Sequence, residues 1–249
     1  MKKILAISLA ALMMLCVIGC DKKDDSSLID GDSNADNEII SSTVKHEGYE
    51  FGYAVNEDGD YEITSVEYTG TASIDIKIPS EVDGRAITGI GADAFKADTF
   101  IKSVVIPSSI TYIDDFAFYG CSGLTSVTLP DSITDIGAGA FWDCTSLKSV
   151  KLSENLINID NYAFMNCTSL ETLTLTAKVE NIGDGAFFSC KKLQTVTLPE
   201  SVKTVGKGAF IYCEALKSVN IESKEIKLAE EGVFIACHKD LVINYPSAK

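Results

Sequence analysis

The 249-residue sequence is poor in the residues that enzymes most often use for acid–base chemistry near neutral pH. It has two histidines, His46 and His238, so a serine or cysteine nucleophile has few possible partners. It contains no glycine-rich phosphate loop and no CxxC or histidine spacing typical of zinc sites. We therefore expect no enzymatic activity, no cofactor and no metal site.

Basic residues are scarce as well. The chain has 21 lysines and arginines against 36 aspartates and glutamates, which gives a formal net charge of −15 at pH 7. Nucleic acids and anionic lipid surfaces attract basic patches, so this composition argues against nucleic-acid binding and against direct adsorption to a membrane.

Long hydrophobic runs are absent after the first 20 residues. The segment MKKILAISLAALMMLCVIGC begins with Lys2 and Lys3 and continues with an apolar run too short to span a bilayer. This pattern predicts an export signal over residues 1–19. Its end, VIGC, resembles a bacterial lipobox, which implies cleavage before Cys20 and a lipid on the Cys20 sulfur, so that the lipid anchor alone would contact the membrane. An ordinary secretory signal followed by a chance cysteine is the alternative.

The segment that follows is low in apolar residues and rich in Asp, Ser, Asn and Gly. Because such a segment cannot bury enough surface to offset its ordering entropy, residues 20–43 are expected to be a lipidated cysteine with a flexible acidic tether. The acidic and lysine residues directly after Cys20 resemble a signal that sends some Gram-negative lipoproteins to the outer face of the outer membrane. The periplasmic face stays open as the alternative location.

A fixed period then dominates the chain. The motif Ala-Phe-x-x-Cys recurs every 23 residues, as AFYGC, AFWDC, AFMNC, AFFSC and AFIYC. A period of this length is typical of a solenoid, in which each repeat buries its apolar face against its neighbours. The motif phenylalanines and cysteines are Phe118, Phe141, Phe164, Phe187, Phe210, Cys121, Cys144, Cys167, Cys190 and Cys213.

One repeat, residues 129–151, indicates the path of the chain. The alternation around Val150 predicts a strand, which ends where proline occurs at the start of a repeat, as at Pro130. A second extended piece is expected over residues 133–136, and Ala140-Phe141 should begin a turn or short helical segment. Each repeat would thus form one flattened coil, with parallel strands about 4.8 Å apart.

Irregular segments flank the regular repeats. Residues 44–77 predict an N-terminal β-hairpin cap with its turn at residues 56–60. Residues 78–249 form the solenoid, whose first copy has a five-residue insertion at about residues 82–86 and whose last copy slips by one residue. Irregular end copies are typical of solenoids, because an unpaired end strand invites aggregation.

The unit C-x-x-L-x-x-V-x-L-P-x-x-I-x-x-I-G-x-x-A-F, over about residues 78–243, closely resembles the BspA-like leucine-rich repeat of bacterial surface lipoproteins. The resemblance implies a leucine-rich repeat solenoid with short parallel strands on one face and turns or short helical segments on the other. It also implies adhesion to extracellular matrix proteins, co-aggregation with other bacteria or host contact. The expected partner is an extracellular or cell-surface protein.

The repeat cysteines are interpreted as inward-facing small hydrophobic residues. Six cysteines remain after loss of Cys16 and lipidation of Cys20, and an oxidising compartment would allow disulfides among them. Stacked side chains point in parallel, however, whereas a disulfide needs a torsion near 90°. We expect free, buried thiols.

Two surfaces are candidates for binding. Residues flanking the inward valine of each strand, such as Ser126 and Thr128, predict a hydroxyl-rich outer face, which is either a plain solvated sheet or a weak site for a glycan or peptide. The residues that follow each motif phenylalanine form a second column, which either widens the core or makes an exposed stripe for a partner. This column consists of Tyr119, Trp142, Met165, Phe188 and Ile211, with Ile235 after the slip.

Two functions fit these observations. The first is a lipid-anchored cell-surface protein that mediates protein binding or adhesion to host or bacterial partners. The alternative is a glycan-binding or assembly component of an outer-membrane complex. The ligand class separates the two, since a glycan binder should respond to soluble oligosaccharide.

Overall fold

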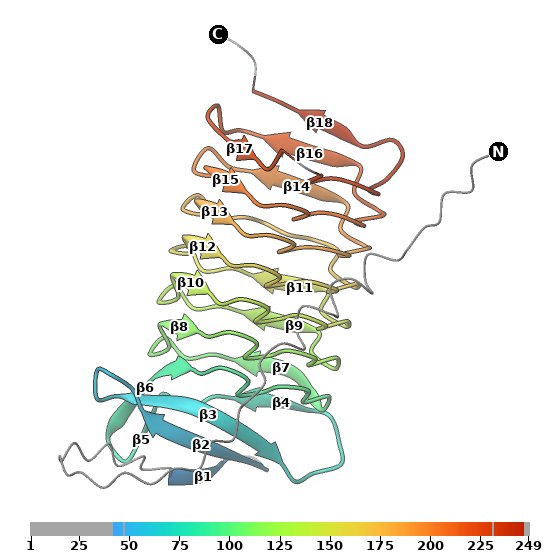
Figure 1. The fold of residues 1–249 in the computed structure, drawn as a ribbon. Helices are drawn as coiled ribbons and strands as arrows, with labels where there is room; N and C mark the ends of the chain where they lie inside the picture. The colour runs from blue at the N-terminus through green and yellow to red at the C-terminus, as the bar shows by residue number, and fades with distance from the viewer. Residues whose placement is uncertain (1–41, 47, 231, 247–249) are drawn as a thin grey trace, which may run out of the picture. The chain divides into compact units, whose positions relative to one another are not determined.

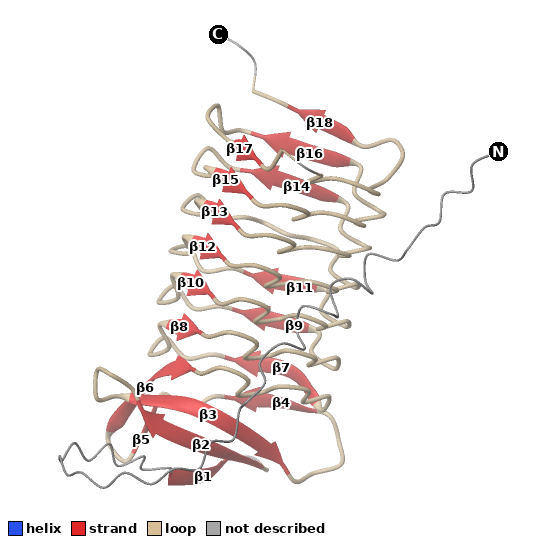
Figure 2. Ribbon diagram, viewed as in Figure 1, coloured by secondary structure: helices blue, strands red, loops and turns tan. Residues whose placement is uncertain are grey.

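The computed structural model describes residues 42–46, 48–230 and 232–246. Within these ranges the chain forms strands and turns and no helix, so the segment after each strand pair is a series of turns (Figures 1 and 2). The described part therefore has no helix able to cross a membrane. The predicted export signal, Cys20 and nearly all of the predicted tether lie outside the described residues.

The first face of the solenoid is an eleven-stranded sheet, called here the long sheet. The strands of successive coils pair in parallel, and partners such as Asp135 and Asn158 are one repeat apart. Its order is β1-β2-β3-β6-β8-β10-β12-β13-β15-β17, with β5 beside β6. The bounds are β1 Ser42–His46, β2 Tyr49–Val55, β3 Tyr61–Tyr68, β5 Glu81–Val82, β6 Arg85–Ile90, β8 Tyr112–Ile113, β10 Asp135–Ile136, β12 Asn158–Ile159, β13 Asn181–Ile182, β15 Thr204–Val205 and β17 Lys227–Leu228.

The second face, called the split sheet, consists of two pieces with parallel strands. The strand order is β11-β9-β7-β4 in the first piece and β14-β16-β18 in the second. Between them the coil at residues 172–175 makes one bridge, from Ser149 to Thr172. The bounds are β4 Ile74–Lys77, β7 Ile101–Val105, β9 Ser126–Thr128, β11 Ser149–Lys151, β14 Thr195–Leu198, β16 Ser218–Ile221 and β18 Val242–Asn244.

The structure confirms the solenoid, with one difference in its strands. The extended piece expected over residues 133–136 is a strand only at β10, because Ile133 closes a turn by donating its N–H to the Pro130 carbonyl at 3.1 Å. Proline fixes its own backbone angle and lacks an N–H, which favours a turn at this corner.

A column of stacked phenylalanine rings runs through the interior. Successive rings are 4.6 to 5.5 Å apart between centroids and within 17° of parallel. This spacing matches that of neighbouring hydrogen-bonded coils, so every coil places the same side chain over the same side chain below. The rings belong to Phe95, Phe118, Phe141, Phe164, Phe187, Phe210 and Phe234.

The cysteines form a second interior column of free thiols. The Cys144 Sγ lies 3.2 Å from the Phe118 carbonyl oxygen of the preceding coil, and that oxygen also accepts the Cys121 N–H at 3.2 Å. The same thiol contact recurs from Cys121 to Cys237. Cysteine thus supplies both a small apolar side chain and a weak donor, which a valine of similar size would lack.

The N-terminal cap closes one end of the phenylalanine column. Strands β2 and β3 form the expected antiparallel hairpin, and the Asn56 Oδ1 accepts N–H groups of Asp58 and Asp60 in its turn. The ring of Phe51 packs edge-on against Phe95 at 6.4 Å. The additional strand β1, which pairs with β2, was not predicted from the sequence.

The insertion in the first copy is itself a small hairpin. Strands β5 and β6 pair antiparallel around Asp83 and Gly84, which have φ angles of 51° and 74°. An Asp-Gly pair suits this turn because both of its central residues need positive φ. The insertion therefore projects from the coil without breaking the stack.

Candidate partner-binding edge

The structure brings the residues after each motif phenylalanine together along one edge of the solenoid. Tyr119, Trp142, Phe188 and Ile211 are half-buried, so they neither enter the core fully nor stand free of it. Met165 is 9% exposed and belongs to the core, whereas Ile235 in the last coil is 57% exposed. The sequence left open whether this column widens the core or is exposed. Met165 lies in the core, Ile235 is exposed, and the other four residues are intermediate.

Two aromatic residues that the sequence reasoning missed complete this edge. Phe116 and Tyr162 lie three residues before Tyr119 and Met165, and both are half-buried. With Tyr119 and Trp142 they form a surface cluster, called here the aromatic edge. The missed signal was in the sequence, because the equivalent position of four other coils is glycine.

The rings of the aromatic edge contact one another across coils. Tyr119 meets Trp142 edge-on at 5.5 Å, and Phe116 lies 6.2 Å from Trp142. On the other side, Tyr162 lies 6.0 Å from Trp142. The single tryptophan of the chain is therefore at the centre of the cluster.

The backbone beneath two of these rings is strained. Phe116 and Tyr162 have φ angles of 57° and 60°, in the left-handed region that bulky side chains rarely adopt. This conformation costs about 1 kcal/mol or more for a residue other than glycine. Coils with glycine at this position avoid the cost, so an aromatic residue here is locally unfavourable.

Glycines in the next coil make room for the two strained rings. A Cβ atom at Gly139 would lie 2.5 Å from the Phe116 ring, and one at Gly185 would lie 2.6 Å from the Tyr162 ring. The alternation of aromatic and glycine residues therefore lets each ring lie flat over the neighbouring coil. A side chain in place of either glycine would displace the ring.

A second unfavourable feature lies at the centre of the cluster. The Trp142 Nε1 is buried and has no hydrogen-bond acceptor among the described residues. A buried donor without an acceptor costs about 1–3 kcal/mol. Strain and an unpaired donor thus meet at one place on the surface, a combination typical of functional sites.

The segments that build the aromatic edge are acidic. The four successive segments that carry it, residues 89–97, 112–120, 135–143 and 158–166, contain six aspartates and one lysine. That lysine, Lys96, pairs with Asp93 at 3.0 Å and lies 5.9 Å from the centre of the Tyr119 ring.

The carboxylates at this edge are held by cross-coil hydrogen bonds. The Asp115 Oδ1 accepts the Ala138 N–H at 2.6 Å, and the Asp143 Oδ1 accepts the Asn166 amide at 2.9 Å. Each bond leaves the carboxylate charge in place, because its donor is neutral. The acidic field is therefore fixed in position next to the rings.

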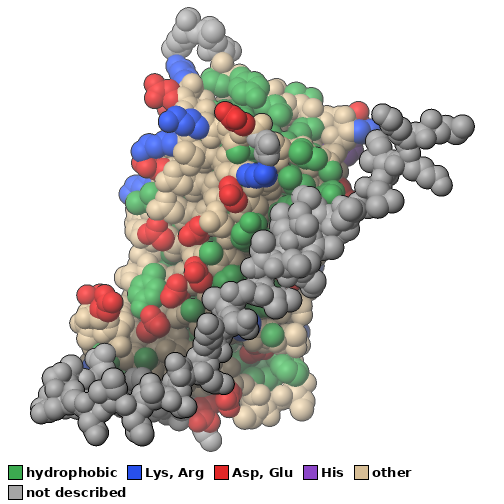
Figure 3. All heavy atoms as spheres, viewed as in Figure 1, with side chains coloured by type: hydrophobic (Ala, Val, Ile, Leu, Met, Phe, Trp, Pro, Cys, Tyr) green, Lys and Arg blue, Asp and Glu red, His purple; other side chains and the backbone are tan. Residues whose placement is uncertain are grey.

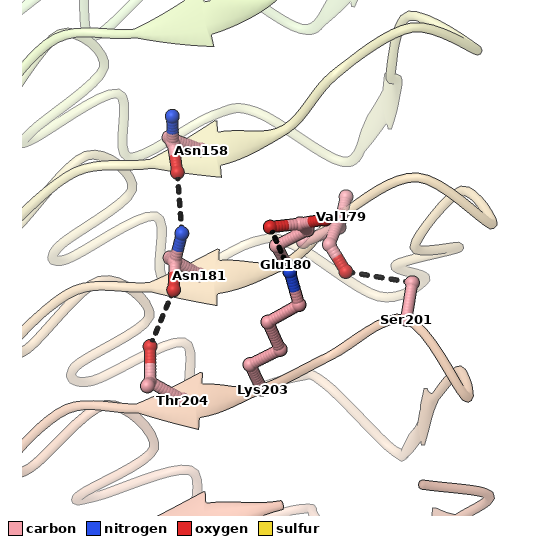
Figure 4. A network of polar contacts seen from close by, with 7 residues as sticks. All are labelled: Asn158, Val179, Glu180, Asn181, Ser201, Lys203 and Thr204. Carbon is pink, nitrogen blue, oxygen red and sulfur yellow. Dashed lines mark hydrogen bonds and ion pairs between the residues drawn. The ribbon is translucent and has the colours of Figure 1, made fainter.

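The long sheet carries a polar column that is mostly satisfied internally. The Asn158 amide donates to Asp135 at 2.5 Å, Asn181 donates to Asn158 at 2.7 Å, and Thr204 donates to Asn181 at 2.8 Å. Figure 4 shows the Asn158-Asn181-Thr204 part of this column and, beside it, the ion pair of Lys203 with Glu180 at 2.6 Å. Because these groups bind each other, few are free to recognise a ligand.

The remaining surfaces bear on the other predictions from the sequence. No group of three or more His, Cys, Asp or Glu side chains that could hold a metal ion occurs in the described part of the chain. The His238 Nδ1 lies 3.8 Å from the Asp240 carboxylate. On the split sheet Ser126 and Thr128 are exposed, as predicted, and form a hydroxyl-rich surface.

Stacked coils of this length and strand pattern define a leucine-rich repeat protein. The family described as "BspA type Leucine rich repeat region" matches residues 88–216 and 157–248, with six copies. This chain belongs to the BspA-type leucine-rich repeat family. Proteins of this fold are generally non-enzymatic.

Two solved structures are similar. A leucine-rich repeat protein of T. pallidum is 32% identical over 78% of each chain, with a TM-score of 0.58. A leucine rich cell surface protein of Faecalibacterium prausnitzii is 28% identical over 74% of this chain and 55% of that one, with a TM-score of 0.59. No curated protein matches this chain.

Proposed function

We propose that this chain is a lipid-anchored cell-surface protein that binds partner proteins through the aromatic edge, without catalysis. The observation that carries the proposal is the cluster of Phe116, Tyr119, Trp142 and Tyr162, which keeps large rings at the surface despite backbone strain. Aromatic side chains dominate protein interfaces because they bury much area at low entropic cost. The cell-surface relative and the lipobox-like VIGC segment support the location.

Adhesion to host matrix proteins or to other bacteria is the proposed use of this edge. The outer face of the outer membrane is the proposed location, because a lipid on Cys20 and a tether of about 20 residues would present the solenoid away from the bilayer.

The test uses cells that express the full chain and are applied to immobilised matrix proteins and to a glycan array. We expect saturable binding to protein that is lost in a Trp142→Ala, Phe188→Ala variant that remains folded at the assay temperature. A Ser126→Ala, Thr128→Ala variant on the split sheet is the control and should bind normally. Binding to glycans alone, or equal binding by the edge variant and the control, would contradict the proposal.

The lipid anchor has its own test. A Cys20→Ala variant should move from the membrane fraction to the soluble fraction, because the acylated sulfur is the proposed membrane contact. If the variant stays in the membrane fraction, the anchor assignment is wrong, while the binding proposal stands or falls separately.

A further inference from the structure

We infer that the aromatic edge recognises a basic, extended segment of its partner, with arginine or lysine side chains stacked on the rings of Tyr119, Trp142 and Tyr162. This inference rests on the proposed function and adds the chemistry of the partner. Its basis is the coincidence of aromatic rings and fixed carboxylates on one edge.

Charge complementarity selects a cationic ligand. Six aspartates and one lysine lie in the segments that build the edge, so the net charge of these segments favours a cationic ligand over an anionic one. Asp115 and Asp143, which directly adjoin Phe116 and Trp142 in the chain, are held by neutral donors and keep their charge for a ligand. An acidic segment would be repelled, and a neutral one would gain nothing from this field.

The protein already places a cation on this surface. The Lys96 Nζ lies 5.9 Å from the centre of the Tyr119 ring while it pairs with Asp93 at 3.0 Å. A ring face and a carboxylate therefore hold one cation together, which is the arrangement inferred for the ligand. Within the described part of the chain, no lysine or arginine lies over the neighbouring rings of Trp142 and Tyr162.

The ring spacing suits an extended chain. Trp142 lies 6.2 Å from Phe116 and 6.0 Å from Tyr162, measured between ring centroids. Alternate side chains of an extended segment point to the same side and are about 6.7 Å apart. A segment with a basic residue at every second position can therefore present successive cations to successive rings. Arginine should bind better than lysine, because its planar guanidinium stacks on an aromatic face.

The C-terminal half of the same column differs in residues and charge, although Phe188 meets Tyr212 edge-on at 5.3 Å there. Phe188 and Ile211 are accompanied by glycine at positions 185 and 208, and Lys207 introduces a positive charge. On the face seen in Figure 3, basic side chains gather over the C-terminal coils with acidic ones among them, while the charged side chains over the middle coils are mainly acidic. The basic segment of the partner should therefore lie along the coils that contain Tyr119, Trp142 and Tyr162, and it should not extend to the coil of Lys207.

The test titrates the full chain in detergent micelles with a fluorescently labelled (Arg-Gly)5 peptide, and with (Lys-Gly)5, (Glu-Gly)5 and (Ser-Gly)5 peptides. Trp142 is the only tryptophan, so its emission reports directly on the edge, and peptide anisotropy gives the affinity. We expect a saturable change with (Arg-Gly)5, weaker binding of (Lys-Gly)5, none with the other two, and loss of affinity as salt rises.

Matched variants locate the site. The double variant Asp115→Asn, Asp143→Asn keeps an oxygen acceptor at each position and removes both charges. Asp131→Asn is the control and removes one charge at another corner of the coil that contains Asp143. The Asp131 carboxylate accepts the Glu154 N–H there at 3.0 Å. Trp142→Ala and the charge-removing pair should each weaken (Arg-Gly)5 binding by about fivefold or more, and Asp131→Asn should change it by less than about twofold.

Three results would overturn the inference. They are (Arg-Gly)5 binding that Trp142→Ala leaves unchanged, equal binding of (Ser-Gly)5, and a Trp142 response to neutral oligosaccharide but not to (Arg-Gly)5. If cells still bind immobilised protein through the edge in any of these cases, the proposed function survives and only the basic partner is wrong. If no protein binds the edge at all, the proposed function fails first.

Discussion

The interior columns and the aromatic edge follow the same 23-residue period, yet they differ in how strictly each repeats its residue. Phenylalanine and cysteine recur in every regular coil inside, whereas the position after phenylalanine is Tyr119, Trp142, Met165, Phe188 and Ile211 in turn. An interior side chain must stack on its copies above and below, so one shape suits all coils. A side chain at the edge also contacts neighbouring coils, but it is partly exposed to solvent, so its shape is less constrained and its identity can vary.

The largest expected difference between the two regions is in stability. Phe164→Ala removes a fully buried ring from the middle of the stack and should lower the free energy of unfolding by about 3–5 kcal/mol. Phe188→Ala, at the half-buried edge of the next coil, should lower it by roughly half as much. Urea denaturation of both variants measures the difference. Equal losses would mean that the edge is simply part of the core.

A smaller effect per side chain should appear at alkaline pH. Burial raises the pKa of the repeat thiols well above their ordinary value of 9.0, and raises that of the half-buried Cys237 to about 11. Above pH 9 the unfolded chain releases thiol protons that the folded chain keeps, so folding stability is full below pH 9 and falls as the pH rises. The free energy of unfolding should fall by about 1 kcal/mol per buried thiol by pH 10.

A Cys167→Ala variant tests the cause of this pH dependence. It should be less stable than the parent at pH 7, because it loses the thiol contact with the Phe141 carbonyl at 3.2 Å. Its stability should fall less steeply between pH 9 and pH 10, because one titrating group is gone. Parallel curves for the two proteins would show that the interior thiols do not control alkaline stability.

The smallest expected change in stability is at the strained position of the edge. Phe116→Gly relieves a left-handed backbone, worth about 1 kcal/mol, and loses ring contacts of similar size with Tyr119 and Trp142. The net change should lie within about 1 kcal/mol of zero, while partner binding is lost. Phe118→Gly, two residues later in the interior column, should unfold the coil. A comparable loss of stability in both variants would contradict the role assigned to Phe116.

The fold could be predicted from the sequence because stacking imposes it. A strict period fixes which residues lie inside, so the phenylalanine column, the free cysteines and the hydroxyl-rich face follow from the spacing of Phe118, Cys121 and Ser126 and their copies. The hairpin over β2 and β3 followed equally from alternation and from the turn residues near Gly59. The interruption of the split sheet near Thr172 had no such signal, because that coil keeps the apolar pattern of its neighbours.

The candidate site was only half predicted. The sequence identified the column from Tyr119 to Ile211 but left open whether its side chains point into the core or out to solvent. Periodicity does not determine how a side chain at a coil corner is oriented. Phe116 and Tyr162 were missed because they occupy a position where most coils have glycine. Their left-handed backbone and their contact with Trp142 exist only once the coils are stacked.

The sequence alone therefore determined the coil, its interior and one face of parallel strands, because adjacent repeats must stack in register. The long sheet on the other face came only with the structure, because the sequence indicated only an extended piece and turns or short helical segments there. Only the tertiary structure decided which surface is distinctive. Rings from residues 46 apart, at Phe116 and Tyr162, meet the same Trp142 because parallel coils bring distant copies of one position into contact. The same stacking sets the distances between the aspartates of separate coils. Their combined electrostatic field depends on these distances, which cannot be obtained from the sequence alone.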